Sequence, residues 1–273
     1  MNASGEQPRR VLITGSSGLI GRTLTDAWRR SGRFVPIGLA RSEGPYTDII
    51  GDITDLDALV ASMDGIDAVV HLAATSAVSS EWDAVRDSNL IGTYNVFEAA
   101  RRAGVNKVVF ASSNHAVGTF ETSNRPELYD LDDGRMIDHT VEIQPDSLYG
   151  VSKAYGEAMA RFYVDHHGVS AVCLRIGSWT GADSPMTPQQ LWDPAKDDNP
   201  EAIANRRRYR ATWLSDRDGV HLIECALATR KRWFLCYGIS NNPRRFWDIE
   251  HAKRGIGFTP QDAAPEEILP GGW

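Results

Sequence analysis

A tyrosine and a lysine four residues apart, Tyr149 and Lys153, have the side-chain types and the spacing needed for proton transfer. In a helix, this spacing places both side chains on one face, one turn apart. A free phenol has a pKa of about 10, and a neighbouring ammonium favours the phenolate and lowers that pKa. Such a pair can accept a proton from a substrate hydroxyl near neutral pH. Because the pattern is short, a surface tyrosine and lysine at chance spacing is the alternative.

Three glycines near the N-terminus, Gly15, Gly18 and Gly21, have the spacing G-x-x-G-x-x-G. A short apolar strand at 11–13 precedes them, and an apolar helical pattern begins inside the motif. Strand, glycine turn and helix form the context that a dinucleotide-binding motif requires. Gly15 would permit a tight turn, Gly18 a close approach of the pyrophosphate, and Gly21 close packing of helix on strand. The helix N-terminus would offer N–H groups to the phosphates. An ordinary glycine-rich turn is the alternative.

The end of the second expected strand, residues 34–40, bears on the choice of cofactor. An NAD site usually carries an acid here, which holds the ribose 2′-hydroxyl, whereas an arginine accommodates a 2′-phosphate. This chain has Ala40 followed by Arg41 and Ser42, and the next acid is Glu43. A guanidinium suits a phosphate dianion. These residues favour NADP over NAD, and a solvated loop arginine is the alternative.

Apolar segments and helical patterns alternate along the first two thirds of the chain. This alternation predicts βαβ units and an α/β fold with a doubly wound parallel sheet of the Rossmann type. Ligands of such sheets lie beyond the carboxyl ends of the strands. After Ser178 the alternation ends, as in a small region that covers a substrate. The further strands are expected at 68–74 and 108–110, and the helices at 56–63 and 89–103.

The composition is that of an ordinary globular chain of 273 residues, 42% hydrophobic and 24% charged. Its formal net charge of -7 gives no reason to expect nucleic-acid or membrane-surface binding. No apolar run approaches the roughly 18 residues that span a bilayer, and residues 1–10 lack the apolar part of a signal peptide. Cys173, Cys225 and Cys236 lack metal-ligand spacing and are expected to be small buried hydrophobes in a reducing compartment. We expect a soluble, cytoplasmic protein without a metal site.

A series of motifs resembles, in order and spacing, the extended short-chain dehydrogenase/reductases, which form the NAD-dependent epimerase/dehydratase superfamily. The resemblance covers about residues 10–180, and residues 257–260 resemble the Gly-aromatic-x-Pro element near the C-terminus of that family. It implies a dinucleotide-binding domain over 1–180 and a smaller substrate-binding region over 181–273, intertwined with the first. The motifs are Thr14-Gly-x-x-Gly-x-x-Gly21, Asp52-x-Thr-Asp55, His71-Leu-Ala-Ala74, Asn89-x-x-Gly-Thr93, Ser112-Ser113 and Tyr149-x-x-x-Lys153.

Within the superfamily, the chain is most similar to the uronate dehydrogenases, and it shares much with a short-chain type of glucose-6-phosphate dehydrogenase. The features in common are the segments 111–115, 148–153, 175–178 and 212–215. Two departures concern the cofactor and the substrate: the acid expected at Ala40 is missing, and the stretch 183–205, with Trp192, is longer than the uronate enzymes need.

The resemblance implies three sets of site residues. The catalytic residues are Ser113, Tyr149 and Lys153. The residues that contact the sugar are Ser76, Ser113, Asn114, His115, Tyr149, Ser178 and Arg208. The residues that bind the cofactor are Gly15, Ser17, Gly18, Leu19, Ile20, Gly21, Arg41, Ser42, Asp52, Ile53, Leu72, Ala73, Ala74, Asn89, Tyr149, Lys153 and Ile176.

The implied reaction is oxidation of the C1 hydroxyl of an anionic cyclic hexose to a lactone, with hydride transfer to the cofactor. NADP is favoured and NAD is the second choice. The sugar could be a uronate, a sugar phosphate such as glucose 6-phosphate, or a sulfonated sugar. Two other functions stay open: a nucleotide-sugar epimerase or dehydratase with tightly bound NAD, and a non-catalytic NADP-sensing regulator.

Arg208 belongs to the densest positive cluster of the chain, residues 206–210. By the resemblance, it stands where the uronate enzymes hold the substrate carboxylate, and its neighbours would raise the local positive potential. A solvated helix face is the alternative for the cluster, and a satisfied histidine at a strand end is the alternative for His115. The helices that begin near Asn89 and Tyr149 form a dimer interface in much of the family, so we expect a homodimer or a multiple of one. Four tryptophans are expected to pack: Trp179, Trp192, Trp213 and Trp247.

Overall fold

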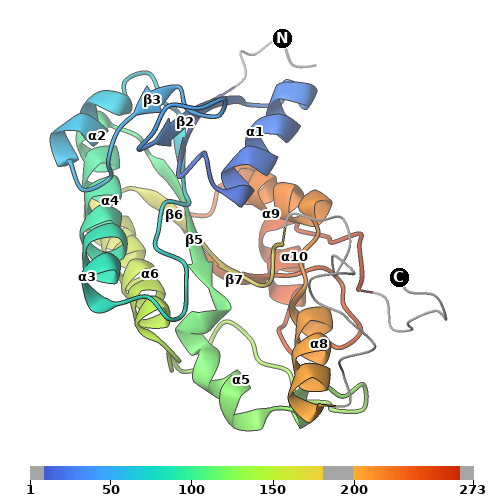
Figure 1. The fold of residues 1–273 in the computed structure, drawn as a ribbon. Helices are drawn as coiled ribbons and strands as arrows, with labels where there is room; N and C mark the ends of the chain where they lie inside the picture. Colours follow the sequence, from blue (N-terminus) through green and yellow to red (C-terminus); the bar gives the residue numbers. More distant parts are fainter. Residues whose placement is uncertain (1–8, 181–198, 265–273) are drawn as a thin grey trace.

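The computed structural model describes residues 9–180 and 199–264 and is built around one parallel sheet (Figure 1). Seven strands have the order β3-β2-β1-β4-β5-β6-β7, and every neighbouring pair is parallel. The chain leaves β1 toward one edge and returns through β4 toward the other, which creates a crevice between these two strands where ligands of such sheets bind. The predicted doubly wound sheet is confirmed. The strands are β1 Arg10–Thr14, β2 Val35–Ala40, β3 Ile49–Ile50, β4 Ala68–His71, β5 Lys107–Ser113, β6 Ser170–Ile176 and β7 Trp233–Gly238.

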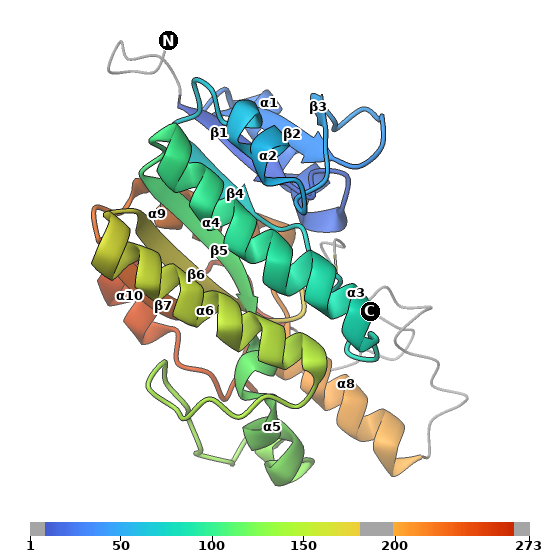
Figure 2. The same cartoon turned by 90° about the vertical axis from the view of Figure 1, so that its left-hand side faces the viewer.

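Helices cover both faces of the sheet (Figures 1 and 2). Three of them, α2 Leu56–Ser62, α4 Gly92–Ala103 and α6 Leu148–His167, bury an apolar cluster in which the Phe97 and Tyr163 rings stack with centroids 5.5 Å apart. The opposite face carries α1 Leu19–Ser31, α9 Asp216–Ala228 and α10 Glu250–Ile256, whose core includes the fully buried Trp28. Apolar strands with helices on both sides are the expected core of such a sheet.

Short elements and one longer helix gather beyond the carboxyl ends of β5 and β6. They bury a third apolar cluster, in which the Tyr237 and Trp247 rings stack with centroids 5.6 Å apart. The helix expected from residue 89 begins earlier, as a π-helical turn at 86–91 that runs into α4. The elements around this cluster are η2 Asn114–Val117, α5 Gly118–Asn124, η3 Glu127–Tyr129 and α8 Pro200–Thr212, whereas α3 Trp82–Val85 and η1 Arg86–Ile91 lead into α4.

The chain after Ser178 contributes more to the sheet than the sequence indicated, because β7 pairs with β6 along its whole length. Trp179, Trp213 and Trp247 are buried, as expected for packing residues. Of the stretch 183–205, only residues from 199 onward are described, and Trp192 lies outside the described residues. The expected division near residue 180 stays a prediction.

Helices that are long and apolar enough to cross a membrane are absent from the described residues. The same residues contain no group of histidine, cysteine and acidic side chains that could hold a metal ion. All three cysteines are free, and burial raises their pKa values, so they are protonated thiols.

Candidate active site

A cavity of about 670 Å³ runs along the carboxyl ends of the central strands, from the glycine turn to α8. It brings together nearly all the residues that the sequence assigned to the cofactor and the sugar. Ser42 and Asn89 are the exceptions, since neither lines the cavity. The predicted residues that do line it are Gly15, Ser17, Gly18, Leu19, Ile20, Gly21, Arg41, Asp52, Ile53, Leu72, Ala73, Ala74, Ser76, Ser113, Asn114, His115, Tyr149, Lys153, Ile176, Ser178 and Arg208.

The glycine turn has no room for side chains at two of its glycines. Gly15 has a φ of 74°, and a Cβ there would lie 2.8 Å from the backbone nitrogen of Ala73. A Cβ at Gly21 would lie 2.6 Å from the Cα of Ser16, so helix α1 can pack this closely only with glycine. Gly18 precedes α1, and no side chain caps the helix there, which leaves N–H groups of its first turn open. This cradle fits a dinucleotide pyrophosphate.

Arg41 follows β2 and lies at the outer end of the same cavity. Its side chain is exposed, and its guanidinium has no hydrogen-bond or ion-pair partner in the described parts of the chain. The buried Ala40 precedes it and offers no carboxylate to a ribose. A ligand phosphate at this end would therefore meet an uncompensated positive charge.

Beneath the glycine turn, a buried histidine links β1 to α4. Nδ1 of His71 lies 2.8 Å from the Thr14 hydroxyl oxygen, and Nε2 lies 3.2 Å from that of Thr93. Burial, with a smaller contribution from the charge of Lys153, lowers the pKa of His71 to about 3. The ring is therefore neutral at physiological pH and supports the turn by hydrogen bonds rather than by charge.

Asn89 acts behind the cavity wall. Its amide oxygen accepts a hydrogen bond from the backbone N–H of Thr75 (2.7 Å), and its nitrogen donates to the Thr75 carbonyl (3.0 Å) and to the Ser152 hydroxyl (2.9 Å). The amide thus ties the loop after β4 to α6. Asn89 and Ser42 lie outside the cavity lining, and the cofactor contacts predicted for them stay predictions.

Tyr149 and Lys153 lie one turn apart on α6, which begins where the Ser147 hydroxyl accepts a hydrogen bond from the Gly150 N–H at 3.0 Å. Lys153 is buried and donates to the carbonyl oxygen of Ala111 at 2.7 Å. Its Nζ lies 5.4 Å from the centroid of the Tyr149 ring. Sequence spacing therefore brought the pair together as expected.

The pKa values of this pair differ from the simple expectation. Burial lowers the pKa of Lys153 to about 8. Burial also raises the pKa of Tyr149, and a hydrogen bond with Ser113 opposes that shift only in part. Desolvation of the phenol therefore dominates, and the predicted net lowering of the Tyr149 pKa is not observed.

Ser113 and Asn114 connect this pair to the far end of the cavity. The Asn114 amide satisfies its neighbours when its oxygen accepts from Nη2 of Arg208 at 3.3 Å. Its nitrogen then donates to the Ser113 hydroxyl and to the Ile176 carbonyl, both at 3.2 Å. The predicted catalytic serine and the predicted sugar-binding arginine are therefore joined through one amide.

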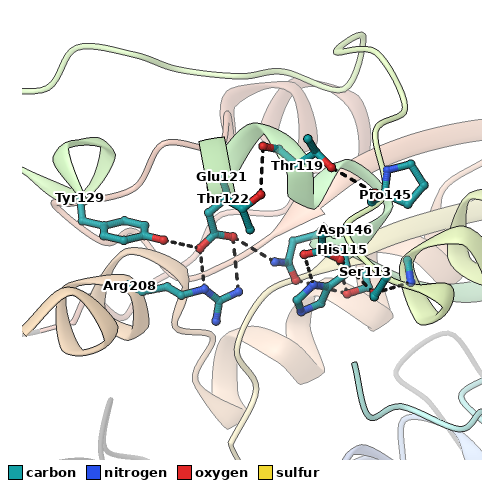
Figure 3. A network of polar contacts seen from close by, with 12 residues as sticks. Ser113, His115, Thr119, Glu121, Thr122, Tyr129, Pro145, Asp146 and Arg208 are labelled. Carbon is teal, nitrogen blue, oxygen red and sulfur yellow. Dashed lines mark hydrogen bonds and ion pairs between the residues drawn. The ribbon is translucent and has the colours of Figure 1, made fainter. Parts of the chain in front are cut away.

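Arg208 reaches this amide from α8 and is paired with an acid that the sequence analysis did not identify. Its Nε lies 2.5 Å from Oε1 of Glu121 on α5, and Nη2 lies 3.3 Å from Oε2 (Figure 3). The Tyr129 hydroxyl donates to the same carboxylate at 2.8 Å. Although burial alone would lower it, the Glu121 carboxylate holds the pKa of Arg208 above its usual value. The arginine is thus a partner in a buried network, and the solvated-face alternative is wrong for this residue.

His115 is held in a similar way by an acid that no motif indicated. Its Nδ1 lies 2.7 Å from Oδ2 of Asp146, and its ring meets the edge of Tyr149 with centroids 5.8 Å apart. Burial would raise the pKa of Asp146, but the hydrogen bond with His115 holds it below its usual value. Glu121, Tyr129 and Asp146 lie outside every spacing motif, so only the folded chain places them at the site.

Comparisons with known proteins agree with this geometry. The NAD-dependent glucose-6-phosphate dehydrogenase of Haloferax volcanii is 37% identical over 276 residues, which cover 97% of each chain. The uronate dehydrogenase of Pseudomonas putida is 33% identical over 261 residues, covering 93% of this chain and 85% of that protein. A crystal structure of a uronate dehydrogenase variant from Agrobacterium tumefaciens, complexed with NAD, superposes with a TM-score of 0.73 at 30% identity, covering 94% of this chain and 86% of that one.

The family comparison covers most of the chain, since the sequence profile described as the NAD dependent epimerase/dehydratase family matches residues 11–232. Together with the relatives that are similar along nearly their whole length, this match confirms the resemblance drawn from the motifs. The chain belongs to the NAD dependent epimerase/dehydratase family.

Proposed function

We propose that the protein oxidises the C1 hydroxyl of an anionic cyclic hexose to a lactone and passes the hydride to a nicotinamide dinucleotide. The observation that carries this proposal is the continuity of one cavity from the glycine turn to Arg208, with Ser113, Tyr149 and Lys153 between them. A cofactor at the first end and a sugar at the second would meet at these three side chains. The similarity to sugar dehydrogenases supports the same reaction.

The proposed chemistry assigns one task to each of the three residues. Tyr149 accepts the proton of the C1 hydroxyl, while Ser113 hydrogen-bonds the same substrate oxygen. Lys153, held by the Ala111 carbonyl, places its charge beside the phenol and favours the phenolate. When bound, the nicotinamide supplies the hydride acceptor. With a pKa of about 8, Lys153 is mostly protonated at neutral pH and can act in this way.

For the cofactor, we propose NADP over NAD. Arg41 supports this choice, because it is exposed, lines the cavity and has no partner within residues 9–180 and 199–264. An arginine here can pair with a 2′-phosphate, and the missing acid at Ala40 removes the usual ligand of the NAD ribose. The Haloferax volcanii relative is NAD-dependent by name and the Agrobacterium tumefaciens structure is complexed with NAD, so NAD is the second candidate.

For the sugar, the first candidate is a uronate, whose carboxylate would bind the open Nη1 group of the Arg208 guanidinium. Nη1 can donate charge-assisted hydrogen bonds to a carboxylate. Glucose 6-phosphate is the second candidate, because a relative with that activity is 37% identical along the whole chain. An epimerase or a dehydratase would instead keep and regenerate its nicotinamide and show no net reduction of added cofactor.

We also propose a homodimer, or a multiple of one, formed through α4 and α6. These helices lie side by side on one face of the molecule (Figure 2). They expose large apolar side chains: Tyr94 is 41% exposed, Val151 45% and Phe162 48%. A monomer in sedimentation at micromolar concentration would contradict this proposal, and the substrate proposal does not depend on it.

A screen of C1 oxidation tests the proposed function. Glucuronate, galacturonate, glucose 6-phosphate, a C6-sulfonated glucose and glucose are each incubated with NAD and with NADP, and reduced cofactor is measured. We expect anionic sugars to exceed glucose by ~10-fold or more in kcat/KM, the effect of one charge-assisted hydrogen bond. Equal activity on glucose and its anionic derivatives would contradict a role for Arg208 in binding the sugar.

A further inference from the structure

Glu121 is the most unusual feature of the sugar end, because it places a buried negative charge behind a site proposed to bind anions. Its side chain is 6% exposed, and it does not line the cavity. It accepts hydrogen bonds from Arg208 and from the Tyr129 hydroxyl. Burial raises the pKa of the Tyr129 phenol, and the negative charge of Glu121 raises it further. The acid is therefore anchored on two sides.

The contacts with Glu121 and Asn114 use Nε and Nη2 of the Arg208 guanidinium and leave Nη1. Glu121 engages Nε and one N–H of Nη2, and the second N–H of Nη2 faces the amide oxygen of Asn114. Nη1 makes no hydrogen bond with the described residues. A ligand acceptor can thus bind at the open side in the cavity. It meets a guanidinium whose charge is already balanced, because Arg208 and Glu121 together carry no net charge.

We propose that Glu121 determines specificity by charge number: it makes the site select singly charged C6 groups, such as a carboxylate, over a doubly charged phosphate. The inference rests on the proposed function, in which Arg208 binds the anionic group of the sugar. It goes further, because the arginine alone would favour the phosphate, whose higher charge gains more from a lone cation.

The physical reason is that Glu121 cancels most of the attraction that Arg208 would exert on a second ligand charge. Either ligand can accept charge-assisted hydrogen bonds from the open Nη1 group of Arg208. Repulsion by the Glu121 carboxylate just behind it grows with ligand charge and is little screened, since that carboxylate is buried. A phosphate monoester carries nearly two charges at neutral pH, because its second pKa is about 6. The second charge therefore gains little net attraction from the neutral pair, while it raises the cost of taking the phosphate out of water.

The test compares ligands of equal shape and different charge. Glucose 6-sulfate and glucose 6-phosphate have the same tetrahedral group, but the sulfate carries one charge. Binding of both, and of glucuronate, is measured by calorimetry on the full chain loaded with NADPH, which cannot accept a hydride. We expect the wild type to bind the sulfate ~10-fold or more tightly than the phosphate, because the phosphate loses more hydration and gains little net attraction from the neutral pair.

The variant Glu121→Gln keeps the shape and an acceptor oxygen but removes the charge. It should strengthen phosphate binding by ~10-fold or more relative to the sulfate, so that the ratio approaches or falls below one. A purely structural role of Glu121 would weaken all three ligands together and leave their ratio unchanged. Glu127→Gln, an acid nearby in the sequence and outside the cavity, should leave the ratio at its wild-type value.

Three results would overturn the inference: a wild type that binds glucose 6-phosphate at least as tightly as the sulfate, an unchanged ratio in Glu121→Gln, or no binding of any of the anions. These results are independent of turnover. Failure of the proposed function would appear instead as absent reduction of added cofactor by the wild type, with the order of anion binding intact.

Discussion

Two arginines stand at opposite ends of the same cavity in different electrostatic surroundings. Arg41, beyond β2, is exposed and has no partner among the described residues. Arg208, on α8, is 22% exposed at its side chain and is paired with the buried Glu121. The charge of Arg41 is uncompensated but screened by solvent, whereas the charge of Arg208 is balanced by Glu121.

This difference implies that the ligand selected by an arginine depends on its charged neighbours as well as on the residue type. A free guanidinium favours the ligand with the most charge, within the limits of solvent screening. A paired guanidinium offers directed N–H groups and favours the ligand whose shape fits them. On this account, the cofactor end selects a 2′-phosphate by charge and the sugar end selects a carboxylate by geometry. Tyr149 and Lys153 lie in the same cavity, where the bound cofactor and the bound sugar would meet.

The largest expected loss of activity is at Tyr149, and it should not depend on which anionic group Arg41 or Arg208 binds. Tyr149→Phe removes the proton acceptor and should lower kcat by roughly 10²–10⁴ for every sugar and either cofactor. Cofactor affinity, measured by fluorescence titration, should change little. Tyr155→Phe on the same helix, outside the cavity, is the matched control. Near wild-type turnover in Tyr149→Phe would disprove the assigned mechanism.

The stability of the fold beneath the cofactor end should depend on pH through the buried, neutral His71. The pKa of His71 is about 3 in the folded protein, against 6.5 for a free histidine, so only the unfolded chain takes up this proton between those values. The free energy of unfolding should therefore fall as the pH drops from 6.5 toward 3. Proton uptake at His71 in the unfolded chain should lower the free energy of unfolding by about 2 kcal/mol at pH 5.

Urea unfolding at about pH 7.5 and pH 5 measures this loss. The variant His71→Asn should be less stable than the wild type at the higher pH, because it gives up hydrogen bonds to Thr14 and Thr93. It should lose less stability between the two pH values, since it cannot take up the proton. An equal loss in both proteins would show that His71 does not titrate as described.

The sequence indicates the positions of Tyr149 and His71, but not their pKa values. The glycine turn, most of the strands and the Tyr149–Lys153 pair follow from apolar runs and short spacings, which can be read from the sequence alone. The direction of the Tyr149 pKa shift could not be read in this way, because desolvation depends on what the folded chain packs around the phenol. His71 was seen only as part of a motif, for the same reason.

The sugar end was the harder part to predict. Glu121 and Arg208 are 87 residues apart in the sequence, and no repeat or motif connects them. Arg208 was identified only because the chain resembles a known family, and nothing marked its partner. The strand β7 was missed because the regular alternation stops at Ser178, while the open edge of β6 still accepts a parallel neighbour. Long-range pairing of this kind appears only in the folded chain.

At the sugar end, Arg208→Ala tests whether this arginine causes the preference for anionic sugars. The variant should erase the ~10-fold advantage of anionic sugars over glucose in kcat/KM, since it removes a charge-assisted hydrogen bond. Activity on glucose should stay close to its starting value. Arg207→Ala is the matched control, because that residue pairs with Asp130 outside the cavity. A preference for anions that survives in Arg208→Ala would place their binding elsewhere.

At the cofactor end, Arg41→Ala should weaken NADP and leave NAD unchanged. The expected loss is ~10-fold or less, because the side chain is exposed and solvent screens its pairing with a phosphate. Raising the salt concentration should shrink the same difference in the wild type. Arg30→Ala, at the far end of α1, is the control for a general change in charge. Unchanged NADP affinity in Arg41→Ala would mean that Arg41 does not bind the phosphate.

In the proposed reaction, hydride leaves C1 of the sugar and remains on the cofactor, and transfer of a deuterium label from C1 measures this step. Glucuronate with deuterium at C1 is incubated with the protein and NADP, and separately with NAD, and both products are analysed by mass spectrometry. We expect one deuterium in the nicotinamide ring for each lactone formed. Deuterium that stays in the sugar, with the cofactor returned to its oxidised form, would contradict the account and indicate an epimerase or a dehydratase.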